Sequence, residues 1–145
     1  MTRHIPISIL VCMIMCCAIA CTDAAPPSEP DKIIWYTYQD MASILENKDD
    51  DRKFMLHFYS VRCGWCTKMN HDVFARPEIV AYINENFIPL RINVSNQPDA
   101  VAKYSVGPVP TTWFLKKDGE KLAMLPGYVP PERFRSILRS IKAEK

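Results

Sequence analysis

The chain has 145 residues, of which 48% are hydrophobic and 10% aromatic, enough to bury the core of one domain. A formal net charge of +2, with no run of basic residues, gives no basis for nucleic-acid binding. Beyond the N-terminus, no apolar stretch approaches the length of a membrane-spanning helix. The composition therefore predicts one folded domain, over residues 33–145, and we expect it to be a monomer.

Residues 1–20 have the pattern of a secretory signal peptide. A short basic start precedes an almost entirely apolar stretch that ends at Ala18-Ile19-Ala20, immediately before Cys21. The stretch is too short and wrongly flanked for a stable membrane span. We therefore expect export, to the periplasm or cell envelope.

Two ways of processing this signal are consistent with the residues around Cys21. Ala-x-Ala is a general signal-peptidase pattern, which predicts ordinary cleavage. A small or apolar triplet before cysteine also resembles the bacterial lipobox, whose cysteine becomes lipidated, although Ala18 stands where a lipobox usually has Leu. Residues 21–32 hold three prolines and predict an extended linker, which suits a membrane tether and a disordered leader equally. Both outcomes stay open.

The first predicted elements are a helix over residues 38–48 and a strand over residues 54–60. Thr37 is the expected N-cap of the helix, and Met41, Ile44 and Leu45 form its apolar face. The strand is apolar on both faces, which is typical of a central strand covered by helices on each side.

Cys63-Gly64-Trp65-Cys66 follows this strand, where a helix is predicted to begin. A helix N-terminus leaves unpaired N–H groups and a positive dipole end facing the first sulfur, which favours the nucleophilic thiolate. The second cysteine lies about one helical turn later, near enough to attack a mixed disulfide. The motif predicts thiol–disulfide exchange.

A C-x-x-C motif is also found in zinc sites and structural disulfides. A closed zinc site usually takes four Cys or His ligands, and no second such pair follows here. His71 is the only nearby imidazole, and Met69 is a poor zinc ligand. The residues favour redox chemistry, with a copper or zinc carrier as an alternative.

The rest of the chain alternates helices and strands. The motif helix ends near residue 72, and Pro77 opens another helix. Asp118-Gly119 predicts a hairpin turn between two strands. Further elements are expected at 87–94 (strand), 98–104 (helix), 111–116 and 120–125 (strands), and from Pro130-Pro131 onward (helix). This order predicts a small α/β sheet with helices on both faces.

The chain resembles the thioredoxin family over residues 33–142. Besides the apolar strand and the cysteine motif, the resemblance rests on Ile92-Asn93-Val94, Lys103-Tyr104, Val109-Pro110-Thr111 and the Asp118-Gly119 hairpin. The segments Cys66-Thr67-Lys68-Met69 and Asp72-Val73-Phe74 look more like the exported members than the cytosolic ones. The resemblance implies the thioredoxin fold, a central mixed sheet flanked by helices on both faces.

The resemblance also implies roles for individual residues. Cys63 would attack the substrate disulfide, and Cys66 would resolve the mixed disulfide. Pro110 would follow a cis peptide bond and expose the backbone of Val109 as an edge for an extended substrate. Gly64 and Trp65, between the cysteines, would contact that substrate.

Four positions depart from the family pattern. His57 stands where thioredoxins usually bury an acid, so it predicts either a proton acceptor for Cys66 or a core histidine satisfied by a backbone carbonyl. Arg91 replaces a family lysine near that position. Trp65 replaces the usual proline between the cysteines. No cationic residue lies between them to stabilise the thiolate, which favours a protein that reduces its substrates. Arg62 adds a cation beside Cys63, which opposes that inference.

We therefore expect an exported thiol–disulfide oxidoreductase that reduces disulfide-containing proteins. The exchange requires no metal or organic cofactor, and a membrane electron donor would restore the dithiol. An oxidant or isomerase of the same fold is the nearest alternative, because dithiols of this superfamily span about −270 to −120 mV.

Overall fold

The structure is a computed structural model that describes residues 32–47 and 49–144. The predicted signal peptide, Cys21 and all but the last residue of the predicted linker lie outside the described residues. Within the described part, no helix has the length and apolar character that crossing a membrane requires.

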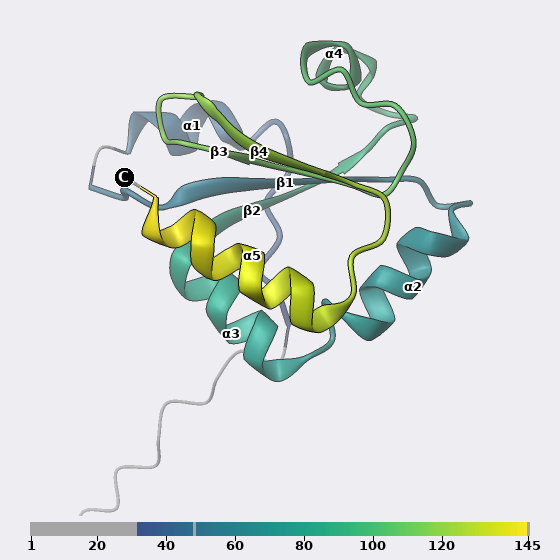
Figure 1. Ribbon diagram of the computed structural model, residues 1–145. Coiled ribbons are helices and arrows are strands. Elements are labelled where there is room, and N and C mark those ends of the chain that lie inside the picture. The colour runs from purple at the N-terminus through teal and green to yellow at the C-terminus, as the bar shows by residue number, and fades with distance from the viewer. Residues whose placement is uncertain (1–31, 48, 145) are drawn as a thin grey trace, which may run out of the picture.

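Four strands form one mixed sheet in the spatial order β2-β1-β3-β4 (Figure 1). β1 runs parallel to β2 and antiparallel to β3, and β4 pairs with β3 in a hairpin. The elements are α1 (Met41–Glu46), β1 (Lys53–Tyr59), α2 (Gly64–Asp72), α3 (Pro77–Asn86), β2 (Phe87–Asn93), α4 (Pro98–Lys103), β3 (Thr111–Leu115), β4 (Lys121–Pro126) and α5 (Pro131–Ala143). The predicted order of helices and strands is confirmed.

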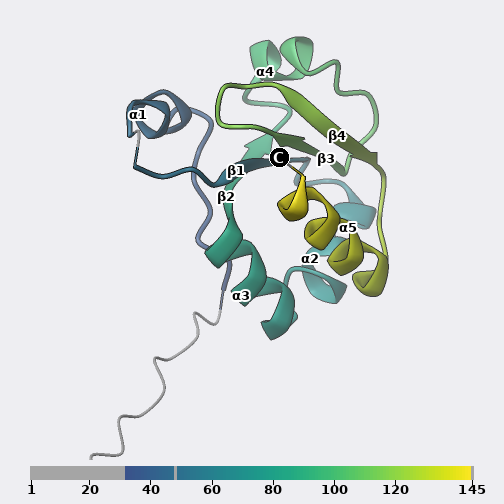
Figure 2. The ribbon, with the colours of Figure 1, turned by 60° about the vertical axis from the view of Figure 1, so that its left-hand side comes forward.

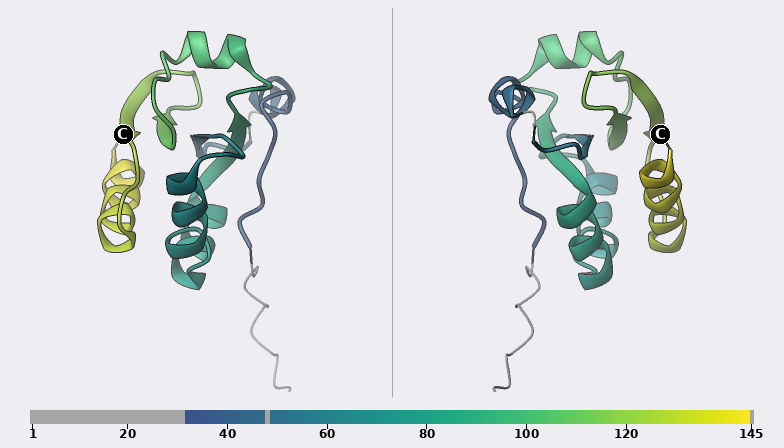
Figure 3. Two further views of the ribbon diagram at one scale, coloured as in Figure 1. Left: turned by 90° about the vertical axis from the view of Figure 1, so that its right-hand side faces the viewer. Right: turned by 90° about the vertical axis from the view of Figure 1, so that its left-hand side faces the viewer.

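Helices cover both faces of the sheet, as predicted. Figures 1 and 2 show α2, α3 and α5 on one face and α1 and α4 on the other, and Figure 3 shows the same separation edge-on. Successive strand residues point to opposite faces, so Met55 joins the core beneath α3 and α5 whereas Leu56 joins the core beneath α1 and α4. The central position of β1 explains why its interior residues are all buried.

The first helix is shorter than predicted, and its expected cap is wrong. The backbone N–H and the hydroxyl of Thr37 both donate to Oδ2 of Asp40, at 2.8 and 2.7 Å. These bonds close a turn over residues 38–40, so that α1 begins only at Met41. Local side-chain bonds of this kind compete with helix formation.

The predicted hairpin is present, with a loop of three residues, 117–119. The N–H of Lys116 donates to the carbonyl of Glu120 at 2.8 Å and closes the loop. Gly119 has a φ of 91°. The last residue of a three-residue hairpin loop usually has such a positive φ, which glycine adopts more easily than other residues. The hairpin brings the end of β4 back toward the start of β3.

Candidate active site

Cys63 lies between β1 and α2 and is the N-cap of that helix. Its extended backbone lets its Sγ atom accept the N–H of Cys66 at 3.0 Å, which satisfies one of the free donors of the first turn. Cys63 and Cys66 are joined by a disulfide, with Cα atoms 5.2 Å apart. The structure therefore brings the two predicted redox cysteines together at the positive end of the helix.

The two cysteines differ in exposure. Cys66 is 1% exposed and belongs to the buried side of α2, next to the core residue Met69. Cys63 is only half-buried, and its Sγ lies 3.5 Å from the carbonyl oxygen of Val109. Of the two sulfurs, that of Cys63 is the one open to a partner from solution.

Val109 and Pro110 approach the disulfide from the segment before β3. The peptide bond between them is cis, as the family resemblance implied. The segment is held from both sides: the Thr111 hydroxyl donates to the carbonyl of Pro108 at 2.7 Å, and the N–H of Gly127 donates to the carbonyl of Pro110 at 2.7 Å. Within the described residues, Val109 itself takes part in no backbone–backbone hydrogen bond, and its carbonyl oxygen contacts only the Cys63 sulfur, so both of its main-chain groups can pair with another chain.

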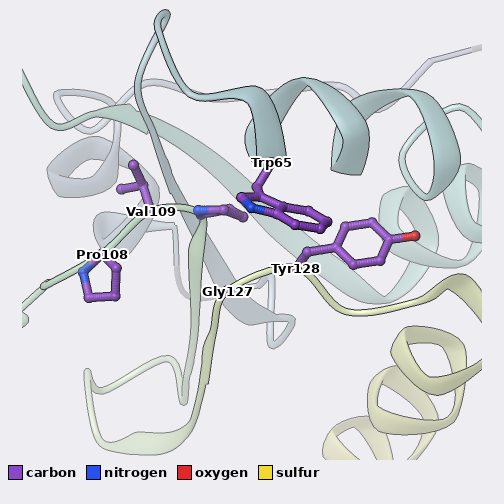
Figure 4. A pocket seen from close by; sticks show the side chains of 6 residues that line it. Trp65, Pro108, Val109, Gly127 and Tyr128 are labelled. Carbon is purple, nitrogen blue, oxygen red and sulfur yellow. The ribbon is translucent and has the colours of Figure 1, made fainter.

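An apolar groove of about 370 Å³ is lined in part by Val109, whose carbonyl oxygen faces the Cys63 sulfur, and Figure 4 shows the side chains that line it. The lining residues are Trp65, Tyr128, Gly127 and the segment Pro108–Pro110. In Figure 4, Trp65 and Tyr128 lie on one side, and Pro108 and Val109 lie on the other. The predicted contact residues Trp65, Val109 and Pro110 thus share one surface. Gly64 does not line the groove, and a Cβ atom placed there would meet nothing within 4 Å.

Sequence reasoning missed Tyr128. The residue follows Gly127, whose φ of 77° turns the chain from β4 back toward the cysteines. A glycine just after a predicted strand is a signal for a bend, but it does not indicate which residue the bend places beside Trp65.

His57 is fully buried in the middle of β1. Its Nδ1 lies 3.1 Å from the Thr112 hydroxyl, and its ring packs edge-on against Phe74, with centroids 4.8 Å apart. Arg91 is its register partner on β2. Burial, with a smaller effect of the Arg91 charge, lowers the pKa of His57 to about 3. The imidazole is therefore neutral at physiological pH and is a weak base.

The residues considered for a metal carrier are not brought together. Met69 is fully buried in the core, whereas His71 is 88% exposed in the last turn of α2, where it pairs with Asp72 at 3.1 Å. Across residues 32–47 and 49–144, no group of three or more His, Cys, Asp or Glu side chains is arranged to hold a metal ion.

A bonded cysteine pair at a helix N-terminus, facing a cis-proline segment on a mixed sheet, defines a thiol–disulfide oxidoreductase of the thioredoxin fold. Comparison with known protein families matches residues 39–142 to the thioredoxin-like domain. The chain belongs to this family. No curated protein sequence matches it.

Solved structures of the same fold cover most of the chain. The DsbH oxidoreductase is 16% identical, with a TM-score of 0.70, over 86% of this chain and 94% of that one. A thioredoxin from Thermus thermophilus is 25% identical, with a TM-score of 0.68, over 77% and 88%. The C-terminal domain of Neisseria meningitidis DsbD, in its oxidised form, is 23% identical, with a TM-score of 0.59, over 70% and 90%.

Proposed function

We propose that this protein reduces disulfides in other proteins after export. The Cys63 thiolate attacks one sulfur of the substrate disulfide, forming a Cys63–substrate bond and releasing the other substrate sulfur as a thiolate, which takes a proton from water. Cys66 then attacks the Cys63 sulfur, and the Cys66 proton ends on the second substrate sulfur as it leaves. The substrate gains two electrons, and the protein is left with the Cys63–Cys66 disulfide.

The difference in exposure between the cysteines supports these roles. An attacking sulfur must be reached by a folded substrate, and Cys63 is the accessible one. A resolving sulfur needs only to reach its neighbour, and Cys66 is buried and already bonded to Cys63. This asymmetry is the observation that carries the proposal.

The surroundings of the Cys63 sulfur support the reducing direction. Strong oxidants of this superfamily owe their potential to a stabilised thiolate in the reduced form. Here the sulfur receives one N–H, from Cys66, and faces the carbonyl oxygen of Val109, which disfavours a negative charge. Among the described residues, no cationic side chain forms a hydrogen bond to it.

A redox titration against glutathione tests the direction. We expect a potential closer to the value of about −270 mV typical of thioredoxin than to the value of about −120 mV of a strong oxidant. We also expect the reduced protein to cleave the disulfides of a folded substrate protein. A potential near about −120 mV would favour the alternative of an oxidant or isomerase. So would faster oxidation of a reduced substrate protein than reduction of its disulfide form.

We propose a structural role for His57. Moving a proton from a thiol of ordinary pKa, about 8.5, to a base of pKa about 3 costs roughly 7 kcal/mol. Nδ1 of His57 lies against the Thr112 hydroxyl rather than against the expected backbone carbonyl, and its Nε2 has no hydrogen-bond partner among the described residues. The ring packs against Phe74 in the core. This supports the core-histidine alternative over proton transfer.

Export, a lipid anchor at Cys21 and a membrane electron donor are also proposals, supported by the pattern of residues 1–32. The intact mass of the mature protein tests the first two. A chain that begins at Cys21 and carries acyl groups would establish the anchor, and an unmodified shortened chain would establish ordinary cleavage. A full-length chain in the producing cell would overturn export.

A further inference from the structure

Two aromatic side chains from distant parts of the sequence meet at the groove. The ring centroids of Trp65 and Tyr128 lie 5.7 Å apart at an angle of 39°, and Trp65 is 61% exposed. Figure 4 shows the two rings side by side, with the Tyr128 hydroxyl directed away from Val109. A large exposed aromatic surface at a binding groove offers apolar contact to a ligand.

Asp72, at the end of α2, holds Tyr128 in this position. The Tyr128 hydroxyl donates to Oδ2 of Asp72 at 3.1 Å, and the same oxygen pairs with Lys68 at 2.5 Å. The Lys68 ammonium also lies 5.3 Å from the centre of the Tyr128 ring. Hydrogen bonds from Lys68 and His71, together with that of Tyr128, lower the pKa of Asp72 to about 2, so the carboxylate stays charged at neutral pH.

We propose that Trp65 and Tyr128 select disulfide substrates with a large apolar side chain two residues from the reacting cysteine, and that Asp72 is the positioning residue that orients Tyr128. This proposal rests on the reductase function proposed above. It assigns a specificity to the groove that the reaction itself does not require.

The geometry of an extended peptide gives the spacing of two residues. A substrate that pairs with the free main-chain groups of Val109 directs its cysteine toward Cys63. Side chains alternate along a strand, so the next ones on the same face are two positions away, about 6.6 Å along the chain. The groove is lined by Val109, whose carbonyl oxygen lies 3.5 Å from the Cys63 sulfur, and by Trp65, two positions after Cys63 in the chain, so such a side chain would enter it close to the sulfur.

The size and polarity of the groove suit one such side chain. Pockets that hold whole small-molecule ligands run from about 300 to 1,000 Å³, so the volume of about 370 Å³ lies at the lower end. The lining consists of Trp65, Tyr128, two prolines, Val109 and Gly127, none of which is charged. A carboxylate side chain of a substrate would lose part of its hydration there without gaining a cationic partner from the lining.

The test uses symmetric disulfide dimers of a short peptide with a central cysteine, bearing Phe or Ala two positions before or two positions after it. We expect kcat/KM to be roughly three- to tenfold higher for Phe than for Ala at one of these positions. Asp72→Asn replaces the charged acceptor by a neutral one, and Tyr128→Phe removes the donor, so each should reduce this ratio. The double variant should reduce it no further than Tyr128→Phe alone, because both changes act on the same hydrogen bond. Tyr128→Ala should remove the preference.

Two controls separate the possible failures. Glu132→Gln makes the same change of carboxylate to amide in an exposed ion pair on α5 and should leave the ratio unchanged. The wild-type protein and Glu132→Gln should reduce hydroxyethyl disulfide, which carries no side chain for the groove, at the same rate. If the protein reduces every peptide at one rate, or if Asp72→Asn keeps the full preference, this inference is overturned while the reductase function stands. If neither peptides nor hydroxyethyl disulfide are reduced, the proposed function itself fails.

Discussion

The Cys63 sulfur lies 3.5 Å from the carbonyl oxygen of Val109, although the two residues are 46 positions apart in the chain. In the exchange that we propose, Cys63 is the nucleophile at the start of a helix, and Val109 is the residue before a strand whose backbone the substrate would pair with. Their proximity means that a chain pairing with Val109 is already within reach of the sulfur. Binding and chemistry therefore share one small surface, which is how positioning lowers the barrier to a bimolecular exchange.

The reduced protein should show one reactive cysteine. Cys63 is half-buried at the positive end of α2, whereas Cys66 is 1% exposed. We expect iodoacetamide at pH 7 to modify Cys63 roughly tenfold faster than Cys66, or more. Peptide mapping by mass spectrometry over a time course measures both rates. Equal rates, or faster modification of Cys66, would contradict the assignment of Cys63 as the attacking residue.

The two cysteine variants should fail at different steps. Cys63→Ser should lose reduction of protein disulfides altogether, because it lacks the nucleophile. Cys66→Ser can still attack but cannot release the substrate, so a covalent complex should accumulate on non-reducing gels and disappear with dithiothreitol. Full turnover by Cys63→Ser, or no complex with Cys66→Ser, would refute the two-step exchange.

His57 should make stability depend on pH below neutrality. Its pKa falls from about 6.5 in the unfolded chain to about 3 in the folded protein, so between these values the unfolded state binds more protons. Stability should therefore decrease as the pH falls, by about 2 kcal/mol between pH 7 and pH 5 from this residue. Urea unfolding at the two pH values measures the change.

His57→Gln is the matched variant for this measurement. Whatever its stability at pH 7, the variant should lose about 2 kcal/mol less stability than the wild-type protein between pH 7 and pH 5, because it lacks the titrating imidazole. It should also keep most of the reductase activity, because we assign the imidazole to the core. A variant that folds but no longer reduces disulfides would instead support proton transfer through His57.

The core beneath α5 should be the main determinant of stability. Phe134 is fully buried and its ring packs edge-on against that of Phe74, with centroids 5.6 Å apart. Phe134→Ala should lower the free energy of unfolding by about 3–5 kcal/mol through lost contacts and the cavity left behind. Arg133→Ala, on the exposed face of the same helix, should change it by less than about 0.5 kcal/mol. Comparable effects of the two substitutions, in thermal or urea unfolding, would contradict this packing.

Much of the site was predictable because its chemistry is local. Cys63 and Cys66 are close in sequence, and a helix beginning between them places their sulfurs together whatever the rest of the fold does. Thr37 illustrates the opposite case: its capping role was reasonable from residue type, but the Asp40 carboxylate bonded it into a turn instead. A helix start depends on which of several local hydrogen bonds forms, and composition does not rank them.

The amino-acid sequence alone determined the apolar central strand, the order of helices and strands, and the cysteine pair, because each depends on hydrophobic periodicity or on neighbours within one helical turn. Tertiary structure decided that Asp72 would hold Tyr128 beside Trp65, that Val109 would approach the sulfur, and that His57 would lie in a site where it remains neutral. Those outcomes depend on how β4, β3 and β2 pack around β1, and therefore on distances between residues far apart in the chain.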